Sequence, residues 1–237
     1  MPVQDDYTAY IRRTAQQPVK NATRASILTA RLRAAIIRGD LKPGQKVNLD
    51  QLRAQYNVSL SPLREAISRL SVDGLVKSLD QRGSTIAPLT LVELNEIVQL
   101  RREVDVYALR EAIKRGGDNW KARLRGAAVV LHSAATAKAG PEFEENWSVA
   151  HTAFHSELIS GCKMPLLIDF CLNLHDLQDR YQRQLAPQLA RCVEVWRIHA
   201  AIATHAVNGE ADSAALAFLT HFDKEIVTVT EQLSQLR

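Results

Sequence analysis

Cysteine is scarce in this chain of 237 residues, and the three that occur lie far apart, at Cys162, Cys171 and Cys192. An odd number of widely spaced cysteines forms no disulfide framework, and no Cys-x-x-Cys pair is present that would hold a metal or carry redox chemistry. The thiols are therefore interpreted as buried side chains of a protein from a reducing compartment, which favours the cytoplasm.

Long apolar runs are also missing. No stretch approaches the roughly 18 apolar residues of a membrane span, and the first 20 residues lack the apolar core of a secretory signal. We therefore expect no membrane partner and a cytoplasmic location. The composition, 46% hydrophobic and 24% charged, is that of an ordinary globular protein with room for two small domains.

Charge is distributed unevenly along the chain. Residues 20–88 hold 12 Lys and Arg against 5 Asp and Glu, whereas residues 89–237 hold 16 against 19. A basic N-terminal third on a mildly acidic remainder indicates that the first part meets a polyanion such as nucleic acid. A basic surface without any partner is the alternative that charge alone leaves open.

The hydrophobic pattern divides the chain into three parts. Residues 1–21 show no periodicity and are predicted to be a mobile arm. Residues 22–88 predict two helices at about 23–38 and 49–56, then a third with Ser61 as its N-cap and Pro62 as its first residue. Two short β-prone stretches on either side of residues 80–83 follow and predict a hairpin. This order is that of a winged helix-turn-helix with a small β-hairpin wing.

Residues 89–237 show no convincing strand. Glycine and proline punctuate helical segments at about 90–115, 119–138, 142–160, 165–185, 188–208 and 211–235. The expected fold class is therefore mainly α: a winged helix-turn-helix followed by an all-α antiparallel bundle of six or seven helices.

The winged helix-turn-helix layout predicts which residues touch DNA. Its third helix enters the major groove with its N-terminus first, and its hairpin loop touches the flanking backbone or minor groove. The candidate contacts are Ser59, Leu60, Ser61 and Arg64 at the helix start, with Arg82 and Gly83 in the wing. For Arg64, a salt bridge to a neighbour such as Asp50 or Asp73 is the alternative.

Two stretches make the N-terminal part resemble a known family. The run from Ile36 to Gly44 contains Gly-x-x-x-Pro-Gly, and the run from Val58 to Leu70 contains Val-Ser-x-x-Pro-Leu-Arg-Glu-Ala. With the wing glycine, these motifs resemble the GntR family of bacterial regulators in order and spacing. The family usually carries Arg where this chain has Leu60, which implies a different base readout, such as contact with a thymine methyl group.

Four histidines stand out in the C-terminal part. His151 and His155 lie four apart and share one helix face, whereas His199 and His221 lie on later helices. Histidines scattered in this way are most often ordinary core or surface residues. The segment His151-x-x-Phe154-His155, then His199-x-x-Ile202 running to Gly209, and then His221 resemble, however, the ligand-sensing FCD domain of the FadR subfamily of GntR regulators.

That resemblance implies a divalent metal in the bundle. His155, His199 and His221 match the three histidines with which many family members hold the ion, and His151 stands where an Asp or Asn is usual. An all-imidazole set suits zinc or nickel, but it carries one negative charge fewer than the usual set.

The resemblance also implies a small carboxylate effector beside the metal. Arg101, with Asp105 four residues later, fits the Arg-x-x-x-Glu pattern of the domain's first helix and is the first candidate to bind the carboxylate. Arg180 and Tyr181 are weaker candidates, for which a solvated helix face is the alternative. Stretches such as Arg115-Gly116-Gly117-Asp118-x-Trp120 and Ser160-Gly161-Cys162 resemble a glutarate-responsive member of the subfamily, which hints at a dicarboxylate or a related organic acid as the effector. His132, His175 and His205 are interpreted as structural.

These features predict a sequence-specific DNA-binding regulator, a repressor of a catabolic operon that an organic acid releases from DNA. Family members are homodimers, which implies a palindromic operator in double-stranded DNA. Two other classes compete: a metal-dependent enzyme that uses the histidines, and an architectural DNA-binding protein without a ligand. No carboxylate at a telling spacing stands out as a general base for the enzyme.

Overall fold

The computed structural model describes residues 23–79, 83–138, 142–186 and 193–235. The predicted arm, residues 1–21, lies outside the described residues. The chain forms two compact units, each described by itself. The N-terminal unit contains the chain up to Thr90 together with Asp176–Gln184, and the helical unit contains Leu91–His175 and the chain from Leu185 onward.

Three helices build most of the N-terminal unit: α2 (Arg24–Arg38), α3 (Leu49–Tyr56) and α4 (Leu60–Val72). Helix α2 begins where the Thr23 side chain accepts a hydrogen bond from the Ser26 amide. It ends at Gly39, whose left-handed φ of 81° is the conformation that glycine adopts without strain. Asn57 ends α3 in the same left-handed region. These boundaries match the predicted ones.

The predicted start of α4 was wrong. Ser59, not Ser61, is the N-cap, so Pro62 is the third helical residue and not the first. Proline is tolerated there because the amides of a first helical turn have no partner within the helix. Sequence spacing alone could not decide between two serines that both precede the same proline.

The wing is a two-stranded antiparallel sheet, β1 (Val76–Leu79) and β2 (Gly83–Ile86), in which Val76 pairs with Ile86 and Leu79 with Gly83. An isolated bridge joins Lys46 to Thr85. Gly83 has a φ of 86°, which favours glycine at this end of the hairpin.

Apolar faces of the three helices and the wing meet in one core. The buried members include Leu28, Leu32, Ile36, Leu52, Leu63, Ala66, Leu70, Val76 and Ile86. Leu177, from the C-terminal part of α8 (Pro165–Leu185), packs against this core. Residues Asp176–Gln184 of α8 thus pack in the N-terminal unit, although they follow Thr90, the end of the rest of that unit, by about 90 residues in sequence.

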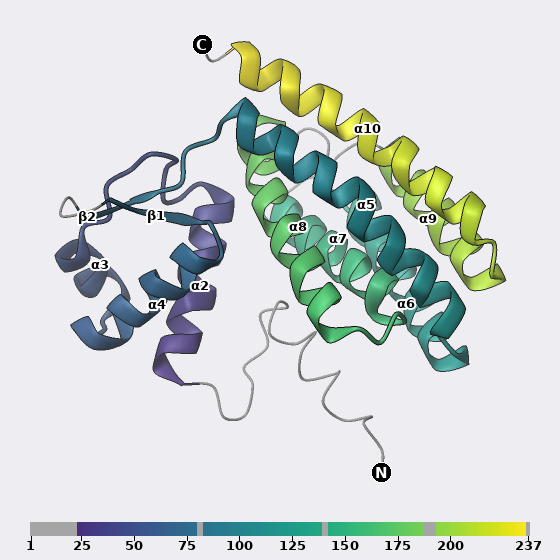
Figure 1. The fold of residues 1–237 in the computed structure, drawn as a ribbon, viewed down its shortest axis with the longest axis horizontal. Coiled ribbons are helices and arrows are strands. Elements are labelled where there is room, and N and C mark those ends of the chain that lie inside the picture. Colours follow the sequence, from purple (N-terminus) through teal and green to yellow (C-terminus); the bar gives the residue numbers. More distant parts are fainter. Residues whose placement is uncertain (1–22, 80–82, 139–141, 187–192, 236–237) are drawn as a thin grey trace. The chain divides into compact units, whose positions relative to one another are not determined.

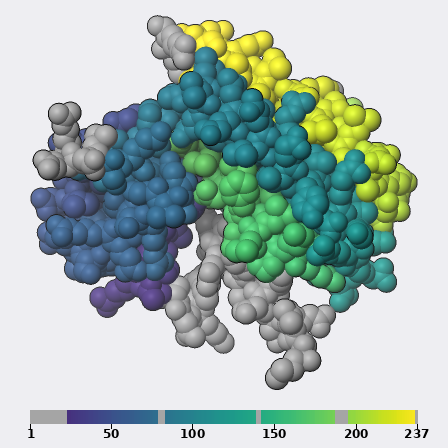
Figure 2. Space-filling view, viewed as in Figure 1, coloured from purple at the N-terminus to yellow at the C-terminus, as the bar shows by residue number. Residues whose placement is uncertain are grey.

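The helical unit is built by helices alone in its described residues. They are α5 (Leu91–Arg115), α6 (Asp118–Thr136), α7 (Phe143–Ser160), the first part of α8, α9 (Val193–Asn208) and α10 (Ala211–Gln235). Helix α10 packs against α5 and α9, and α6 packs against α7 and α9 (Figure 1). The surfaces of α5 and α10 adjoin in the space-filling view (Figure 2).

The predicted fold class is confirmed: a winged helix-turn-helix followed by a bundle to which six helices contribute in the described part of the chain. Among the described residues, no helix combines the length and the apolar character needed to cross a bilayer. The sharing of α8 between the two units was not predicted.

Candidate functional site

The N-terminal end of α4 offers an exposed polar surface. Ser59, Ser61 and Arg64 are exposed, and Leu60 is half-buried. No side-chain hydrogen bond caps the helix at Ser59, so its first-turn amides and hydroxyls have no capping partner within the helix. Amides at a helix N-terminus attract phosphate oxygens, which is the chemistry expected of a helix that enters a DNA groove.

Arg64 makes no salt bridge within the described residues. The two carboxylates considered for it are occupied elsewhere: Asp50 pairs with Arg53, and Asp73 pairs with Arg33. Neither of the two salt bridges considered for Arg64 is therefore formed. Gly83 is exposed on the wing, and Arg82 lies outside the described residues.

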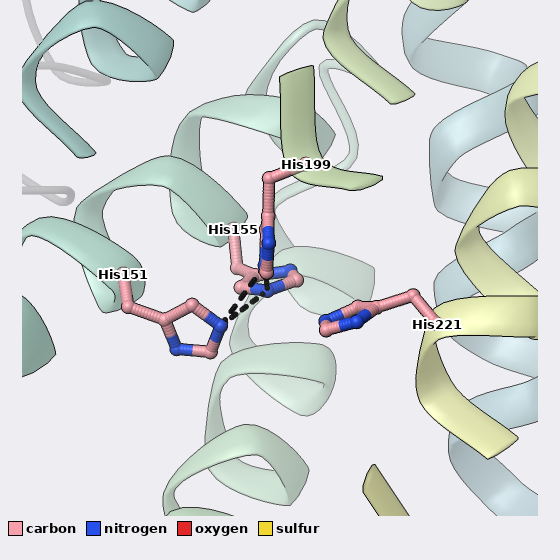
Figure 3. Close-up of side chains that lie close together, drawn as sticks. All are labelled: His151, His155, His199 and His221. Carbon is pink, nitrogen blue, oxygen red and sulfur yellow. Dashed lines mark hydrogen bonds between the residues drawn. The ribbon is translucent and has the colours of Figure 1, made fainter. Parts of the chain in front are cut away.

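The four predicted histidines come together inside the helical unit, although they lie on three helices. His151 and His155 project from α7, His199 from α9 and His221 from α10 (Figure 3). Their ligand atoms all lie within 4.8 Å of one another, and all four side chains are buried. We call these four residues the histidine cluster.

Three of the ring nitrogens form a tight triangle. The Nε2 atoms of His151, His155 and His199 are separated by 3.0, 3.1 and 3.1 Å (Figure 3). Two nitrogens bound to one ion at about 2.0–2.1 Å are roughly 3.0–3.4 Å apart when they are adjacent ligands. The triangle thus has the size of one face of a metal coordination shell.

Hydrogen bonding alone cannot satisfy this triangle. Each neutral Nε2 atom either donates or accepts, so at least two of three mutually adjacent nitrogens play the same role. The Nδ1 atom of His199 lies 2.6 Å from the Val195 carbonyl oxygen and donates to it, so its Nε2 atom carries a lone pair. A cation that accepts the three lone pairs removes the conflict, and the contact to Val195 orients His199 as a ligand.

Burial keeps the histidine cluster neutral. It lowers the pKa of His199 and of His221 to about 3, and it holds the pKa values of His151 and His155 well below their usual value. Neutral imidazoles are the form that binds metal ions, so no proton has to leave the folded cluster before an ion enters.

His221 completes the set. Its Nε2 atom is buried and has no hydrogen-bond partner, which is costly unless a ligand occupies it. The Oε1 atom of Glu225, one turn later on α10, lies 3.3 Å away. The Glu225 side chain is buried and supplies a negative charge beside four neutral rings. The donor set and the unpaired nitrogen both fit a divalent cation such as zinc or nickel.

A small pocket adjoins the cluster. We call it the Arg101 pocket; its lining is Arg101, Asp105, His155, Leu158, Ile159, Cys171, Leu172, His175 and Phe218. The Nε atom of Arg101 donates to the Asp105 carboxylate at 2.8 Å, and its guanidinium lies over the Phe222 ring. The free space is about that of one water molecule, so the pocket as it stands is too small for an organic acid.

Some predicted site residues lie elsewhere. Arg180 and Tyr181 belong to the N-terminal unit and do not line the Arg101 pocket. Conversely, His175 and Cys171 line it although neither was singled out as a site residue. The signal for them was present, because positions 171 and 175 are one helical turn apart and therefore share a face of α8. Glu225 could have been found from His221 by the same spacing.

An exposed helix-turn-helix with a wing, joined to a helical unit with a buried histidine cluster, defines a DNA-binding transcriptional regulator. Family models agree: residues 25–86 match bacterial regulatory proteins of the gntR family, and residues 96–224 match the FCD domain. The chain belongs to the GntR family of bacterial regulators that carry an FCD domain. It is a regulator and not an enzyme.

Curated relatives are regulators as well. The chain is 32% identical to the HTH-type transcriptional repressor GlaR of Escherichia coli over 151 residues, which cover 64% of this chain and 69% of that protein. It is 28% identical to the HTH-type transcriptional regulator BphR of Paraburkholderia xenovorans, over 93% of this chain and 91% of the relative.

Solved structures share the fold. Escherichia coli McbR/YncC aligns with a TM-score of 0.76 at 18% identity and covers 90% of this chain and 99% of its own. A putative GntR regulator from a Rhodococcus species aligns with a TM-score of 0.71 at 20% identity, over 89% and 99% of the two chains.

Proposed function

We propose that this regulator is a repressor of the FadR subfamily that leaves its operator when a small organic acid binds in the Arg101 pocket, beside a divalent metal held by the histidine cluster. The observation that carries the proposal is the triangle of three Nε2 atoms, which a bound cation would satisfy, next to a buried arginine. His151, His155, His199 and His221 would hold the ion, and Arg101 would pair with a carboxylate.

Charge supports an anionic effector. A divalent ion and the Arg101 guanidinium together carry more positive charge than the nearby carboxylates of Asp105 and Glu225 can neutralise. An excess of positive charge in a buried site favours an anion that enters without its water. When bound, the metal would attract a carboxylate oxygen by its positive charge, and Arg101 would pair with the carboxylate group.

On the DNA side, Ser59, Ser61, Arg64, Gly83 and Arg82 would contact the operator, and Leu60 would touch a thymine methyl group. A homodimer would place two α4 helices on two half-sites of a palindrome.

Metal analysis of the purified protein tests the first part. We expect near-stoichiometric zinc or nickel in the wild-type protein, and its loss in a His155→Ala variant. His132→Ala is the matched control because His132 is exposed on α6, outside the cluster. Metal-free wild-type protein purified in the presence of zinc would overturn the metal site.

DNA selection from random duplexes, followed by titration of the selected operator, tests the second part. We expect a palindromic site bound at least about 10³-fold more tightly than random DNA. Linear dicarboxylates (malonate, succinate, glutarate and adipate) are then added to the complex. Release of the operator by one of them, dependent on zinc and on Arg101, supports the proposal; retention with all organic acids tested contradicts it.

A further inference from the structure

The second half of α8 is bound into the N-terminal unit by side-chain hydrogen bonds. Arg33 of α2 donates from one nitrogen to Asp176 of α8 at 2.7 Å and from the other to Asp73. Asp73 is the C-cap of α4. One guanidinium thus connects α2, the end of α4 and α8.

Contacts further along α8 extend this attachment. Arg180 donates to the Ala87 carbonyl oxygen at 3.1 Å, and the Tyr181 hydroxyl exchanges hydrogen bonds with the Thr90 backbone at 3.2 and 3.3 Å. Gln184 donates to the Ile36 carbonyl oxygen at 3.3 Å. The Arg180 and Tyr181 side chains are 1% and 0% exposed. Breaking hydrogen bonds of buried polar groups is costly, so these contacts hold the segment in the N-terminal unit.

The first half of α8 lines the Arg101 pocket. Cys171, Leu172 and His175 form part of its wall, and the His175 ring lies with its centroid 5.1 Å from that of His155. His175 is followed directly by Asp176. The last pocket-lining residue of α8, His175, and the first residue bonded to the N-terminal unit, Asp176, are therefore adjacent in one uninterrupted helix. The backbone hydrogen bonds of the helix make it stiff from one residue to the other.

The small size of the Arg101 pocket makes movement necessary. With free space for about one water, the Arg101 pocket cannot take an organic acid unless one of its walls shifts. Packed interiors transmit such a shift because they do not deform continuously. A shift of the α8 wall reaches Asp176 through the helix backbone.

We propose that α8 couples the Arg101 pocket to the DNA-binding helix α4, and that the Asp176–Arg33–Asp73 bridge is the contact that joins them. The proposal rests on the proposed function for the existence of an effector, but the coupling itself is tested without one. By reciprocity, if events in the pocket alter DNA binding, DNA binding must alter the pocket.

Amide hydrogen exchange of the full-length protein with and without the selected operator is the test. In the wild-type protein we expect the operator to slow exchange in α4 and also to change exchange in residues 165–175 by about fivefold or more. In Asp176→Asn, which keeps the side-chain shape and leaves Arg33 paired with Asp73, α4 remains protected, and the change in residues 165–175 falls below about twofold.

Two further variants separate the bridge from general effects. Tyr181→Phe removes both hydrogen bonds between the hydroxyl and the Thr90 backbone and should likewise reduce the change in residues 165–175. Asp40→Asn removes an exposed ion pair with Arg38 in the same unit and should behave as the wild type. Equal exchange of residues 165–175 with and without operator in the wild type overturns the proposal, as does an undiminished change in Asp176→Asn.

Zinc alone, added to metal-free protein, distinguishes the two proposals. Slower exchange at residues 151–155 reports on the metal site whether or not coupling exists. If that slowing is missing, the metal site fails while the operator experiment still decides the coupling. If it is present and reaches α2 in the wild type but not in Asp176→Asn, the coupling is supported.

Discussion

At the scale of single residues, Arg64 differs from Arg53 and Arg69 in having no carboxylate partner among the described residues. It is exposed at the start of α4 and has no salt bridge in the described part of the chain, whereas Arg53 and Arg69 pair with carboxylates. An unpaired guanidinium is ready to bind a phosphate or a guanine edge without first breaking an ion pair.

Arg64→Ala is therefore expected to weaken binding of the selected operator by about 1–3 kcal/mol. Arg69→Ala, on the same helix but paired with Glu65, is the control and should weaken binding less. Fluorescence anisotropy with labelled operator measures both. Equal losses of operator affinity in the two variants would show that Arg64 makes no specific contact with DNA.

The histidine cluster makes the metal-free protein sensitive to acid. Its buried rings have lowered pKa values in the folded protein, whereas the same histidines titrate near about 6.5 in the unfolded chain. Below that pH the unfolded state binds more protons than the folded state, so the free energy of unfolding decreases as the pH falls. The stabilisation is fully present above about pH 6.5.

In the presence of a chelator, we expect urea unfolding followed by tryptophan fluorescence to show this loss between about pH 7 and pH 5, by up to about 1.4 kcal/mol per pH unit for each histidine. Trp147 stacks on His151 and so reports on the cluster. His155→Gln should reduce the slope by about one histidine, and His132→Gln should not. A metal-free protein equally stable across this range would contradict the buried, neutral cluster.

Among the elements, α2 depends most on its terminal glycine. Gly39 has a φ of 81°, and a Cβ atom there would lie 3.1 Å from two carbon atoms of Gln184. Both the left-handed backbone at Gly39 and the nearby Gln184 side chain make any residue with a Cβ atom unfavourable at this position. Gly126, in the middle of α6, has open space around it and no such backbone requirement.

Substitution of the two glycines by alanine should therefore change the free energy of unfolding in opposite directions. Gly39→Ala is expected to destabilise the protein by about 1 kcal/mol or more, because alanine pays for the left-handed conformation. Gly126→Ala is expected to stabilise it by roughly 0.5–1 kcal/mol through better helix propensity. Chemical denaturation measures both, and a Gly39→Ala protein as stable as the wild type would be inconsistent with this cap.

On the scale of the whole molecule, the homodimer proposed above makes a prediction about mass and operator symmetry. A single α4 reaches only a few base pairs, and a dimer doubles the site with a fixed half-site spacing. Light scattering should give twice the 26.4 kDa of one chain at concentrations that bind the operator.

Changing the same base pair in either half-site should weaken binding equally, by about 1–3 kcal/mol. Full affinity for an isolated half-site, or a monomer bound to the operator, would refute the dimeric arrangement.

Much of the fold followed from periodicity and punctuation. The predicted boundaries of α3 and of α8 coincide with the observed ones, because apolar spacing and turn residues act locally. The GntR motifs identified the class of regulator, and the family models confirm it. The start of α4 was misplaced by two residues, since Ser59 and Ser61 are equally good N-caps by composition.

The sequence by itself determined the elements, the family and the types of side chain available for metal and carboxylate binding, because these depend on local pattern and residue chemistry. It placed His151 and His155 on one helix face, but only the packing of α7, α9 and α10 brings His199 and His221 to them. Tertiary structure alone also decided the surroundings of Arg180 and Tyr181, which are buried in the N-terminal unit and not solvated. Contacts between residues about 90 positions apart leave no trace in local periodicity, since that periodicity records which face of a helix is buried and not what covers it.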